Sequence, residues 1–244
     1  MPNKRLLPEP QGSYEVLTIA EGTPGTTLPA ALRFDWVVFN TDRGCNTFSL
    51  RNNTIRNHRA RGMLIKASDG VIEGNAIENS TLGGIVVTPE LYWGEGDFVS
   101  NLTIESNSVR SVCIGLQCYG GLALGAKDPA GDLAPFYGHQ DVRIVRNRFE
   151  NISQMNLWIS SSQRVEVIGN TIVGPFAYTP VATCCPPYPF PHTFAAWVTT
   201  TKSGNISDNC VFHPPPVSQK ISLFNVTDSV VDVSIDRSGG FRVC

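Results

Sequence analysis

The chain has 244 residues, of which 41% are hydrophobic and 16% are charged, and its formal net charge is −2. This length and balance suit one sizeable folded core and exclude a disordered chain, and the near-neutral charge gives no electrostatic basis for binding nucleic acid. No stretch approaches about 18 uninterrupted apolar residues, so we expect no membrane-spanning segment and no membrane partner.

The N-terminal residues, the sequons and the cysteines bear on the cellular compartment of the protein. Residues 1–15 have a basic start but no apolar run long enough for a signal peptide. Six Asn-x-Ser/Thr sequons and seven cysteines nevertheless favour an oxidising, extracellular compartment. The sequons begin at Asn52, Asn79, Asn101, Asn151, Asn205 and Asn225. We therefore expect a secreted protein whose signal peptide is not part of this chain.

Residues 1–45 match the remainder of the chain poorly. The stretches YEVLTIA and DWVVF have the composition of strands, and EGTPGTT between them is typical of a loop. We expect this segment to be a lead-in, or the remnant of a preceding module, ahead of a repetitive domain at 46–244.

From residue 46 onward the chain repeats itself around six asparagines. In each copy an aliphatic residue lies three positions before the asparagine, and Ile, Val or Phe lies two positions after it. The asparagines are Asn53, Asn75, Asn107, Asn147, Asn170 and Asn209. Their spacings of 22, 32, 40, 23 and 39 residues fit a period of about 22 with three insertions. A fixed period of this size indicates a solenoid.

The apolar residues of each unit identify the kind of solenoid. They are mostly β-branched and closely spaced, as in VRIV and VEVI, and no 3.6-residue stripe runs through them. This pattern predicts an all-β chain that forms a right-handed parallel β-helix, with three short strands in each coil. We expect each repeated asparagine to take the left-handed conformation at a bend and to hydrogen-bond the asparagine of the next coil.

Three loop insertions are predicted, at 88–100, 119–141 and 174–194. The first two follow the segments GGIVV and IGLQC, which we interpret as matching strands of adjacent coils. Both should then leave from the same corner and wall a groove, whereas the third should cover a different side. Long loops on a rigid β scaffold commonly carry binding and catalysis.

Carboxylates and aromatic side chains gather in and beside the first two insertions. Glycoside hydrolysis needs two carboxyl groups, and aromatic rings offer flat apolar faces to sugar rings. The candidate catalytic residues are Glu95, Glu90 and Asp69, and the candidate stacking residues are Trp93, Tyr92, Tyr119 and Tyr137.

Two arginines and the scattered histidines complete the candidate chemistry. Arg59 and Arg61 alternate around Ala60, where they either bind the substrate or form a surface ion pair with Glu73 or Asp69. The four histidines have neither HxH nor HExxH spacing, and no DxD run is present, so we expect no metal and no cofactor.

Residues 57–109 contain the motifs Arg59-Ala60-Arg61-Gly62, Val71-Ile72-Glu73-Gly74-Asn75, Glu90 and Trp93-Gly94-Glu95. With these motifs the segment resembles the β-helix α-1,3-galactosidases, glycoside hydrolases that release terminal galactose with inversion. The resemblance implies that Glu90 and Glu95 lie in the substrate site and that Arg61 supports it.

The leading hypothesis is a secreted carbohydrate-active protein, an inverting exo-glycosidase that acts on terminal α-galactosyl residues. The first alternative is a non-catalytic glycan-binding or surface β-helix. The second is a polysaccharide lyase, which would use a base such as Lys66, Arg59, Arg61 or Lys127 on an acidic substrate. We also expect self-association through exposed coil ends.

Overall fold

The computed structural model describes residues 46–93, 95–115, 119–128, 131–153, 155–175, 194–213, 222–227, 232–235 and 240–244. The expected lead-in at 1–45 lies outside these residues, and so does nearly all of the expected insertion at 174–194. Strands dominate the described part, in which the one helix is the short 3-10 turn η2 (Leu91–Trp93). The prediction of an all-β chain is confirmed.

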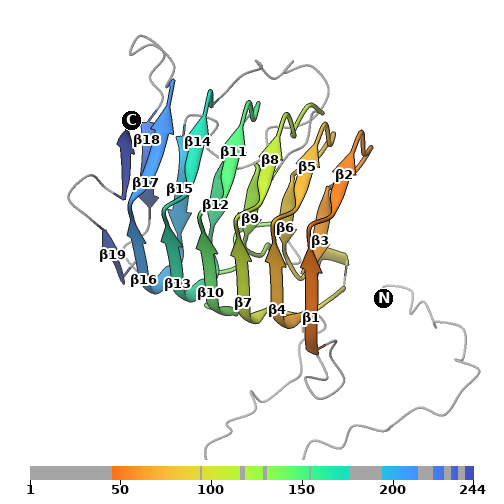
Figure 1. The fold of residues 1–244 in the computed structure, drawn as a ribbon. Coiled ribbons are helices and arrows are strands. Elements are labelled where there is room, and N and C mark those ends of the chain that lie inside the picture. The colour runs from red at the N-terminus through yellow and green to blue at the C-terminus, as the bar shows by residue number, and fades with distance from the viewer. Residues whose placement is uncertain are drawn as a thin grey trace, which may run out of the picture. The chain divides into compact units, whose positions relative to one another are not determined.

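The strands form three parallel sheets, and each coil adds one strand to each sheet in turn (Figure 1). Sheet A contains β1 (Asn46–Arg51), β4 (Ser68–Glu73), β7 (Ser100–Glu105), β10 (His139–Val145), β13 (Ser162–Ile168), β16 (Thr201–Ser207) and β19 (Asp232–Ile235). Sheet B contains β2 (Thr54–Arg56), β5 (Ala76–Glu78), β8 (Ser108–Arg110), β11 (Arg148–Glu150), β14 (Thr171–Val173), β17 (Asn209–Phe212) and β20 (Phe241–Val243). Sheet C contains β3 (Met63–Ile65), β6 (Ile85–Val87), β9 (Leu122–Leu124), β12 (Leu157–Ile159), β15 (Phe194–Thr199) and β18 (Ser222–Thr227). This arrangement is the predicted parallel β-helix.

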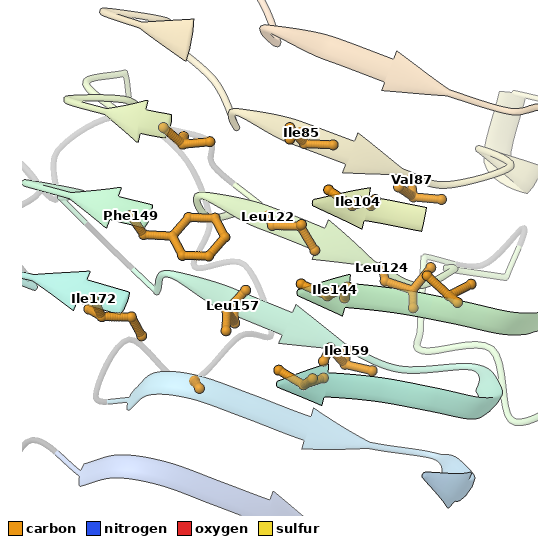
Figure 2. Close-up of a cluster of buried hydrophobic side chains, with 14 of the residues drawn as sticks. Ile85, Val87, Ile104, Leu122, Leu124, Ile144, Phe149, Leu157, Ile159 and Ile172 are labelled. Carbon is orange, nitrogen blue, oxygen red and sulfur yellow. The ribbon is translucent and has the colours of Figure 1, made fainter. Parts of the chain in front are cut away.

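Aliphatic side chains from the three sheets fill the interior of the coils (Figure 2). Ile85, Leu122 and Leu157 follow one another along sheet C, because the register pairs Ile85 with Leu122 and Leu122 with Leu157. Ile104 and Ile144 are paired in the same way in sheet A, and all five side chains are at most 1% exposed. Stacking like residues at the strand spacing of about 4.8 Å removes apolar surface from water, which is the main stabilising term.

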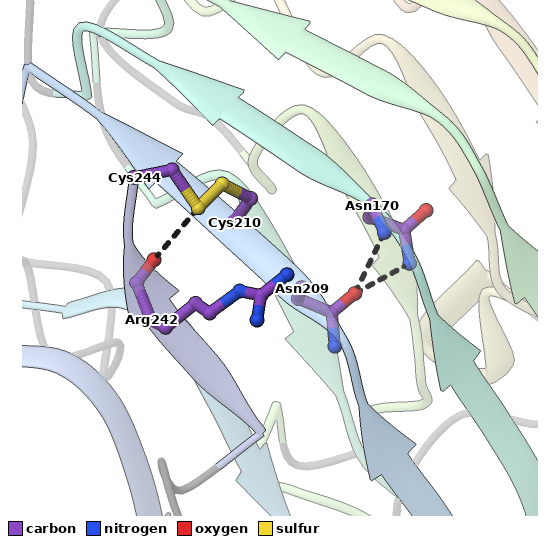
Figure 3. The surroundings of a disulfide bond; sticks show 5 residues. All are labelled: Asn170, Asn209, Cys210, Arg242 and Cys244. Carbon is purple, nitrogen blue, oxygen red and sulfur yellow. Dashed lines mark hydrogen bonds between the residues drawn. A yellow bond between two sulfur atoms is a disulfide. The ribbon is translucent and has the colours of Figure 1, made fainter.

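The six repeated asparagines form the predicted ladder. At each step the backbone N–H and the side-chain Nδ2 of one asparagine donate to Oδ1 of the asparagine in the next coil, at 2.9–3.0 Å. Figure 3 shows the last step, from Asn170 to Asn209. Each ladder asparagine from Asn75 onward is at most 1% exposed, so the side chains satisfy backbone groups that water does not reach.

The left-handed conformation at this bend falls one residue earlier than predicted. Positive φ angles occur directly before each ladder asparagine, at Asn52, Gly74, Ser106, Arg146, Gly169 and Asp208, and the ladder asparagines are not among the residues with positive φ. The preceding residue makes the turn, and the asparagine supplies the hydrogen bonds that hold it. Because only the hydrogen bonds require asparagine, the residue before it varies from coil to coil while the asparagine repeats.

Several sequon asparagines lie at positions where the backbone has a positive φ angle, which gives a structural reason for asparagine there. Asn52, Asn79, Asn101 and Asn151 all have φ angles between 52° and 54°. Asparagine tolerates this region better than most residues do, because its short side chain bonds locally. The backbone therefore favours asparagine at these corners whether or not a glycan is attached.

The second insertion does not have the expected bounds of 119–141. The strand that matches β6 is β9 (Leu122–Leu124) and not IGLQC, because Ile85 pairs with Leu122 and Val87 pairs with Leu124. The additional residues are divided between 111–121, before β9, and 125–138, after it. The segments 88–99 and 125–138 both connect sheet C to sheet A in adjacent coils, so two long loops do leave from the same corner.

A disulfide fastens the last strand of sheet B to its neighbour (Figure 3). Cys210 in β17 and Cys244, directly after β20, are bonded across 34 residues of sequence with their Cα atoms 5.8 Å apart. The Cys244 N–H also donates to the Val211 carbonyl at 3.0 Å. Cys113 is disulfide-bonded as well.

Replacing Cys244 by serine is expected to loosen only the coil that contains β20. Each coil of a solenoid contacts only its neighbours, so we expect a cost of about 1–2 kcal/mol in local stability. Hydrogen exchange should rise in β20 and stay unchanged in β10 and β13, and Cys210→Ser should behave in the same way. An equal rise in all three strands would contradict a local role.

Candidate functional site

The site is built on the outer face of sheet C. The central residues of its short strands point away from the core and form a row, in which Val86 pairs with Ala123, Ala123 with Trp158, and Trp158 with Trp197. All four are buried, because Met155, Tyr119 and Leu133 pack over them together with the loops that carry these residues. Loops therefore close the apolar outer face of sheet C.

A pocket of about 220 Å³ opens on this face. Among the described residues it is lined by Thr88, Glu90, Leu91, Trp93, Tyr119, Lys127, Gly131 and Trp158. These residues come from the loop after β6, from both sides of β9 and from β12. The volume lies below the roughly 300–1,000 Å³ of pockets for drug-sized ligands, so the pocket suits a ligand of about one small ring.

Glu90 is the centre of a chain of ion pairs in the wall of this pocket. Its Oε1 accepts a hydrogen bond from Nη2 of Arg61, and its Oε2 accepts one from Nζ of Lys66 at 2.9 Å. The same Nζ donates to Oε2 of Glu95 at 2.7 Å. The Glu90 side chain is 9% exposed and that of Glu95 is 59% exposed. Lys66 thus joins one buried and one exposed carboxylate.

The backbone at Glu90 is held in an unfavourable conformation. Its φ angle is 51°, in the left-handed region that costs an ordinary residue about 1–2 kcal/mol. The Glu90 carbonyl accepts the Trp93 N–H at 2.9 Å and so closes the turn η2, while Leu91 is only 6% exposed. The hydrogen bonds from Arg61 and Lys66, together with the anchored turn, hold the Glu90 carboxylate in place despite this strain.

The ion pairs around Lys66 shift the pKa values of the groups that form them. The hydrogen bond from Lys66 lowers the pKa of Glu95 below its usual value. Burial lowers the pKa of Lys66, but its hydrogen bonds to Glu95 and Glu90 outweigh burial, so the pKa is raised overall. Both groups therefore keep their charges at neutral pH.

Lys127 occupies a different environment in the same pocket. Burial lowers its pKa to about 8, although the negative charge of Asp132 opposes the shift. A short antiparallel bridge between Lys127 and Leu133, closed by the Asp128 N–H on the Asp132 carbonyl at 2.8 Å, fixes its position. A fraction of Lys127 is therefore neutral near pH 7–8 and can accept a proton.

Aromatic rings form the apolar part of the pocket. Tyr119 stacks on Trp158 with ring centroids 6.1 Å apart and an interplanar angle of 17°. Arg61 and Lys127 approach the Tyr119 ring, with Cζ and Nζ at 5.7 and 6.0 Å from its centroid. Trp93 is 70% exposed at the mouth of the pocket, where a large apolar side chain offers surface to a ligand.

Several of the predicted site residues are brought together. Glu90, Trp93 and Tyr119 line the pocket, and Arg61 and Glu95 are connected to it through Glu90 and Lys66. The expected alternative pairing of Arg61 with Glu73 or Asp69 is wrong, because Arg61 pairs with Glu90 and Glu73 pairs with Arg51 at 2.6 Å.

Other predicted residues lie elsewhere. Asp69 is an exposed residue of β4 that accepts a hydrogen bond from Nδ2 of Asn101 at 2.8 Å, and it is not among the described lining residues. Arg59 is exposed, and its carbonyl accepts a hydrogen bond from the Thr81 hydroxyl. Tyr137 is half-buried and its carbonyl accepts from Gln163 at 3.4 Å. The side chain of Tyr92 is outside the described part of the chain.

Trp158 was not predicted from the sequence, and Lys66 and Lys127 were predicted only as candidate bases of a lyase. A usable signal was present, since the glycine pair Gly83-Gly84 before β6 recurs as Gly120-Gly121 before β9. The Ile85 N–H donates to the Gly121 carbonyl at 2.9 Å, and a Cβ on Gly84 would lie 2.5 Å from that oxygen. Aligning the two glycine pairs in the sequence locates the strands of sheet C and the residues of those strands that point outward.

A family model described as right handed beta helix region matches residues 41–212. The chain belongs to this family. The matched range contains every strand from β1 to β17, so the right-handed β-helix includes the whole pocket. No match is found among curated proteins. Across the described ranges, no helix is long and apolar enough to cross a membrane, and no three His, Cys, Asp or Glu side chains come together as metal ligands.

Proposed function

We propose that this right-handed β-helix protein is carbohydrate-active and that the pocket on sheet C binds one sugar residue at the end of a glycan. The observation that carries this proposal is the combination of a small pocket, aromatic rings and a buried, oriented carboxylate. The apolar faces of a sugar ring pack on aromatic side chains, while its hydroxyl groups need fixed donors and acceptors. Trp93 and Tyr119 supply the rings, and Glu90 and Lys127 supply the polar groups.

Hydrolysis of a terminal α-galactosyl bond is the reaction that the resemblance of residues 57–109 favours. An inverting pair needs carboxyl groups about 6.5–9.5 Å apart. The Oε2 atoms of Glu90 and Glu95 cannot be farther apart than the sum of their 2.9 and 2.7 Å distances to Lys66. A substrate would therefore have to open the Lys66 bridge before inversion, so we propose glycan binding as the primary function and hydrolysis as the second.

One observation supports a lyase reaction as a further candidate. Lys127 lies in the pocket with a pKa lowered to about 8, which suits a base that removes a proton next to a carboxylate. An acidic oligosaccharide is then the substrate class to compare with the neutral one.

Replacing Trp93 by alanine is expected to weaken glycan binding about tenfold. The ring provides the exposed apolar surface at the pocket mouth, and stacking contacts of this kind contribute about 1–1.5 kcal/mol. The measurement is saturation-transfer NMR and calorimetry with an α-1,3-linked galactosyl disaccharide, a neutral control disaccharide and an oligogalacturonate. Phe212→Ala, an exposed aromatic position on sheet B, is the matched control. Unchanged affinity in Trp93→Ala would contradict the proposed pocket.

The same disaccharide separates binding from hydrolysis. Release of β-galactose, seen by NMR before the anomers equilibrate, would support an inverting hydrolase, and its loss in Glu95→Gln with binding retained would give Glu95 the catalytic role. Binding without release leaves a glycan-binding protein. An unsaturated product from the oligogalacturonate would instead favour the lyase.

We further propose that the protein acts outside the cell. The disulfides of Cys210–Cys244 and of Cys113 support this proposal, since such bonds persist in oxidising compartments.

A further inference from the structure

A buried histidine connects the two loops that form the pocket. His139 is the first residue of β10, directly after the loop 125–138. Its Nδ1 accepts the N–H of Val99, at the end of the first loop, at 3.2 Å. Its Nε2 lies 3.2 Å from the carbonyl of Gly125, at the start of the second loop. Because Nδ1 must accept, the neutral ring carries its proton on Nε2 and donates it to Gly125.

The surroundings of His139 are apolar. Its side chain is fully buried, and the Phe98 ring meets it edge-on with centroids 5.0 Å apart. Phe136, from the second loop, packs in turn on Phe98 at 5.4 Å. On the side of β13, the Ser161 carbonyl accepts the His139 N–H at 3.0 Å. Both loops therefore meet around one imidazole ring.

The charged residues closest in sequence to His139 and to the residues around it form hydrogen bonds or ion pairs with other groups. Oδ1 of Asp97, next to Phe98, accepts the Phe98 N–H at 2.7 Å. Asp141, two residues after His139, is half-exposed and pairs with Arg164 at 2.6 Å. Phe98, Val99, Gly125 and Ser161 do not titrate, so the two hydrogen bonds and burial decide the state of the ring.

We propose that His139 is a positioning residue of the pocket: its neutral ring holds the two loops together, and its protonation separates them. Protonation adds an N–H at Nδ1, which then faces the N–H of Val99, so two donors meet and the bond is lost. The coupling of the loops stands independently of the ligand, whereas its consequence for glycan binding rests on the proposed function.

The pH window follows from burial. Burial lowers the pKa of His139 to about 4 from its ordinary value of 6.5, and the hydrogen bond to Gly125 opposes the shift only in part. An unfolded chain takes up this proton at the higher pH, so the contribution of His139 to stability is complete above about pH 6.5 and is lost as the pH falls toward 4. The loops of the native protein are expected to separate near the lower end of this window.

Hydrogen exchange of the ligand-free protein tests the proposal. After correction for intrinsic rates, exchange in 88–99 and 125–138 is expected to be at least about tenfold faster at pH 4 than at pH 7. Strands β13 and β16, which lie beyond the loops, should change much less. Pocket loops whose protection does not depend on pH, or a uniform increase that includes β13 and β16, would overturn the inference.

Two variants distinguish positioning from packing. His139→Phe keeps an aromatic ring but removes both bonds, so its loops should exchange rapidly at every pH. His139→Asn keeps an acceptor for Val99 but does not titrate, so its loops should stay protected at pH 7 and lose the acid response. If His139→Asn keeps the acid response, another group is responsible. Because no ligand is present, these outcomes are separate from success or failure of the glycan-binding experiments.

Discussion

Replacing Asn147 by alanine is expected to lower the free energy of unfolding by about 4 kcal/mol. Nδ2 of Asn147 donates to Oδ1 of Asn170 and to the Ile104 carbonyl, and its Oδ1 accepts from both the backbone and the side chain of Asn107. The residue is 1% exposed, so water cannot replace these partners without entering the core. Each buried group left unsatisfied costs about 1–3 kcal/mol, and partial relaxation reduces the sum.

Asn53 provides the control for this experiment. It is the first described rung of the ladder, and it is exposed. Its Nδ2 donates to Oδ1 of Asn75 and to the Arg51 carbonyl, and no third side-chain bond is recorded for it in the described residues. Both variants are compared with the unsubstituted protein by unfolding in urea, and we expect Asn53→Ala to lower the free energy of unfolding by about 1 kcal/mol. Equal effects at the two positions would show that the ladder does not carry the stability assigned to it.

Replacing Glu90 by alanine is expected to lower the free energy of unfolding by about 2–3 kcal/mol and to abolish the proposed glycan binding in the pocket. The change leaves Arg61 and Lys66, which are 24% and 20% exposed, without the buried carboxylate that both contact. Lys66 keeps its bond to Glu95, so the main cost comes from Arg61, an uncompensated cation whose partial exposure keeps the effect below that of a fully buried pair. The measurement combines thermal unfolding with titration of the α-1,3-linked galactosyl disaccharide.

Two further variants show where this cost comes from. Glu95→Ala removes a carboxylate that is 59% exposed, so it should change stability much less than Glu90→Ala does. Adding Arg61→Leu to Glu90→Ala should recover part of the lost stability, because it removes one unpaired cation. The cost of Arg61→Leu alone is measured for comparison. If adding Arg61→Leu to Glu90→Ala lowers stability by that same amount, the two residues act independently and the proposed coupling is wrong.

The coils could be predicted from sequence because their constraint is local and repeated. Each bend between sheets A and B needs a side chain that satisfies buried backbone groups, and asparagine can do this in every coil because coils stack in register. Aliphatic residues at constant offsets from Asn75, Asn107 and Asn147 then define the core positions. The turn itself was misplaced by one residue, because several residue types tolerate positive φ once hydrogen bonds hold the bend.

The third sheet was harder to locate, because most of its strands are only three residues long and IGLQC, which also contains several apolar residues, resembles a strand as the true strand LAL does. The packing decides between them, since only Leu122 and Leu124 come into register with Ile85 and Val87. Glycine pairs mark this sheet, but their meaning depends on how closely the coils approach each other.

By itself, the sequence determined an all-β solenoid of about 22-residue coils, its asparagine ladder and the two neighbouring loops that carry acidic and aromatic residues. Only the tertiary structure decided which of those side chains meet. Arg61, Glu90 and Tyr119 come from three successive coils, and their contacts depend on loop paths that no repeat specifies. Periodic hydrogen bonding fixes a backbone from local patterns, whereas a pocket depends on the directions of side chains brought together from distant parts of the chain.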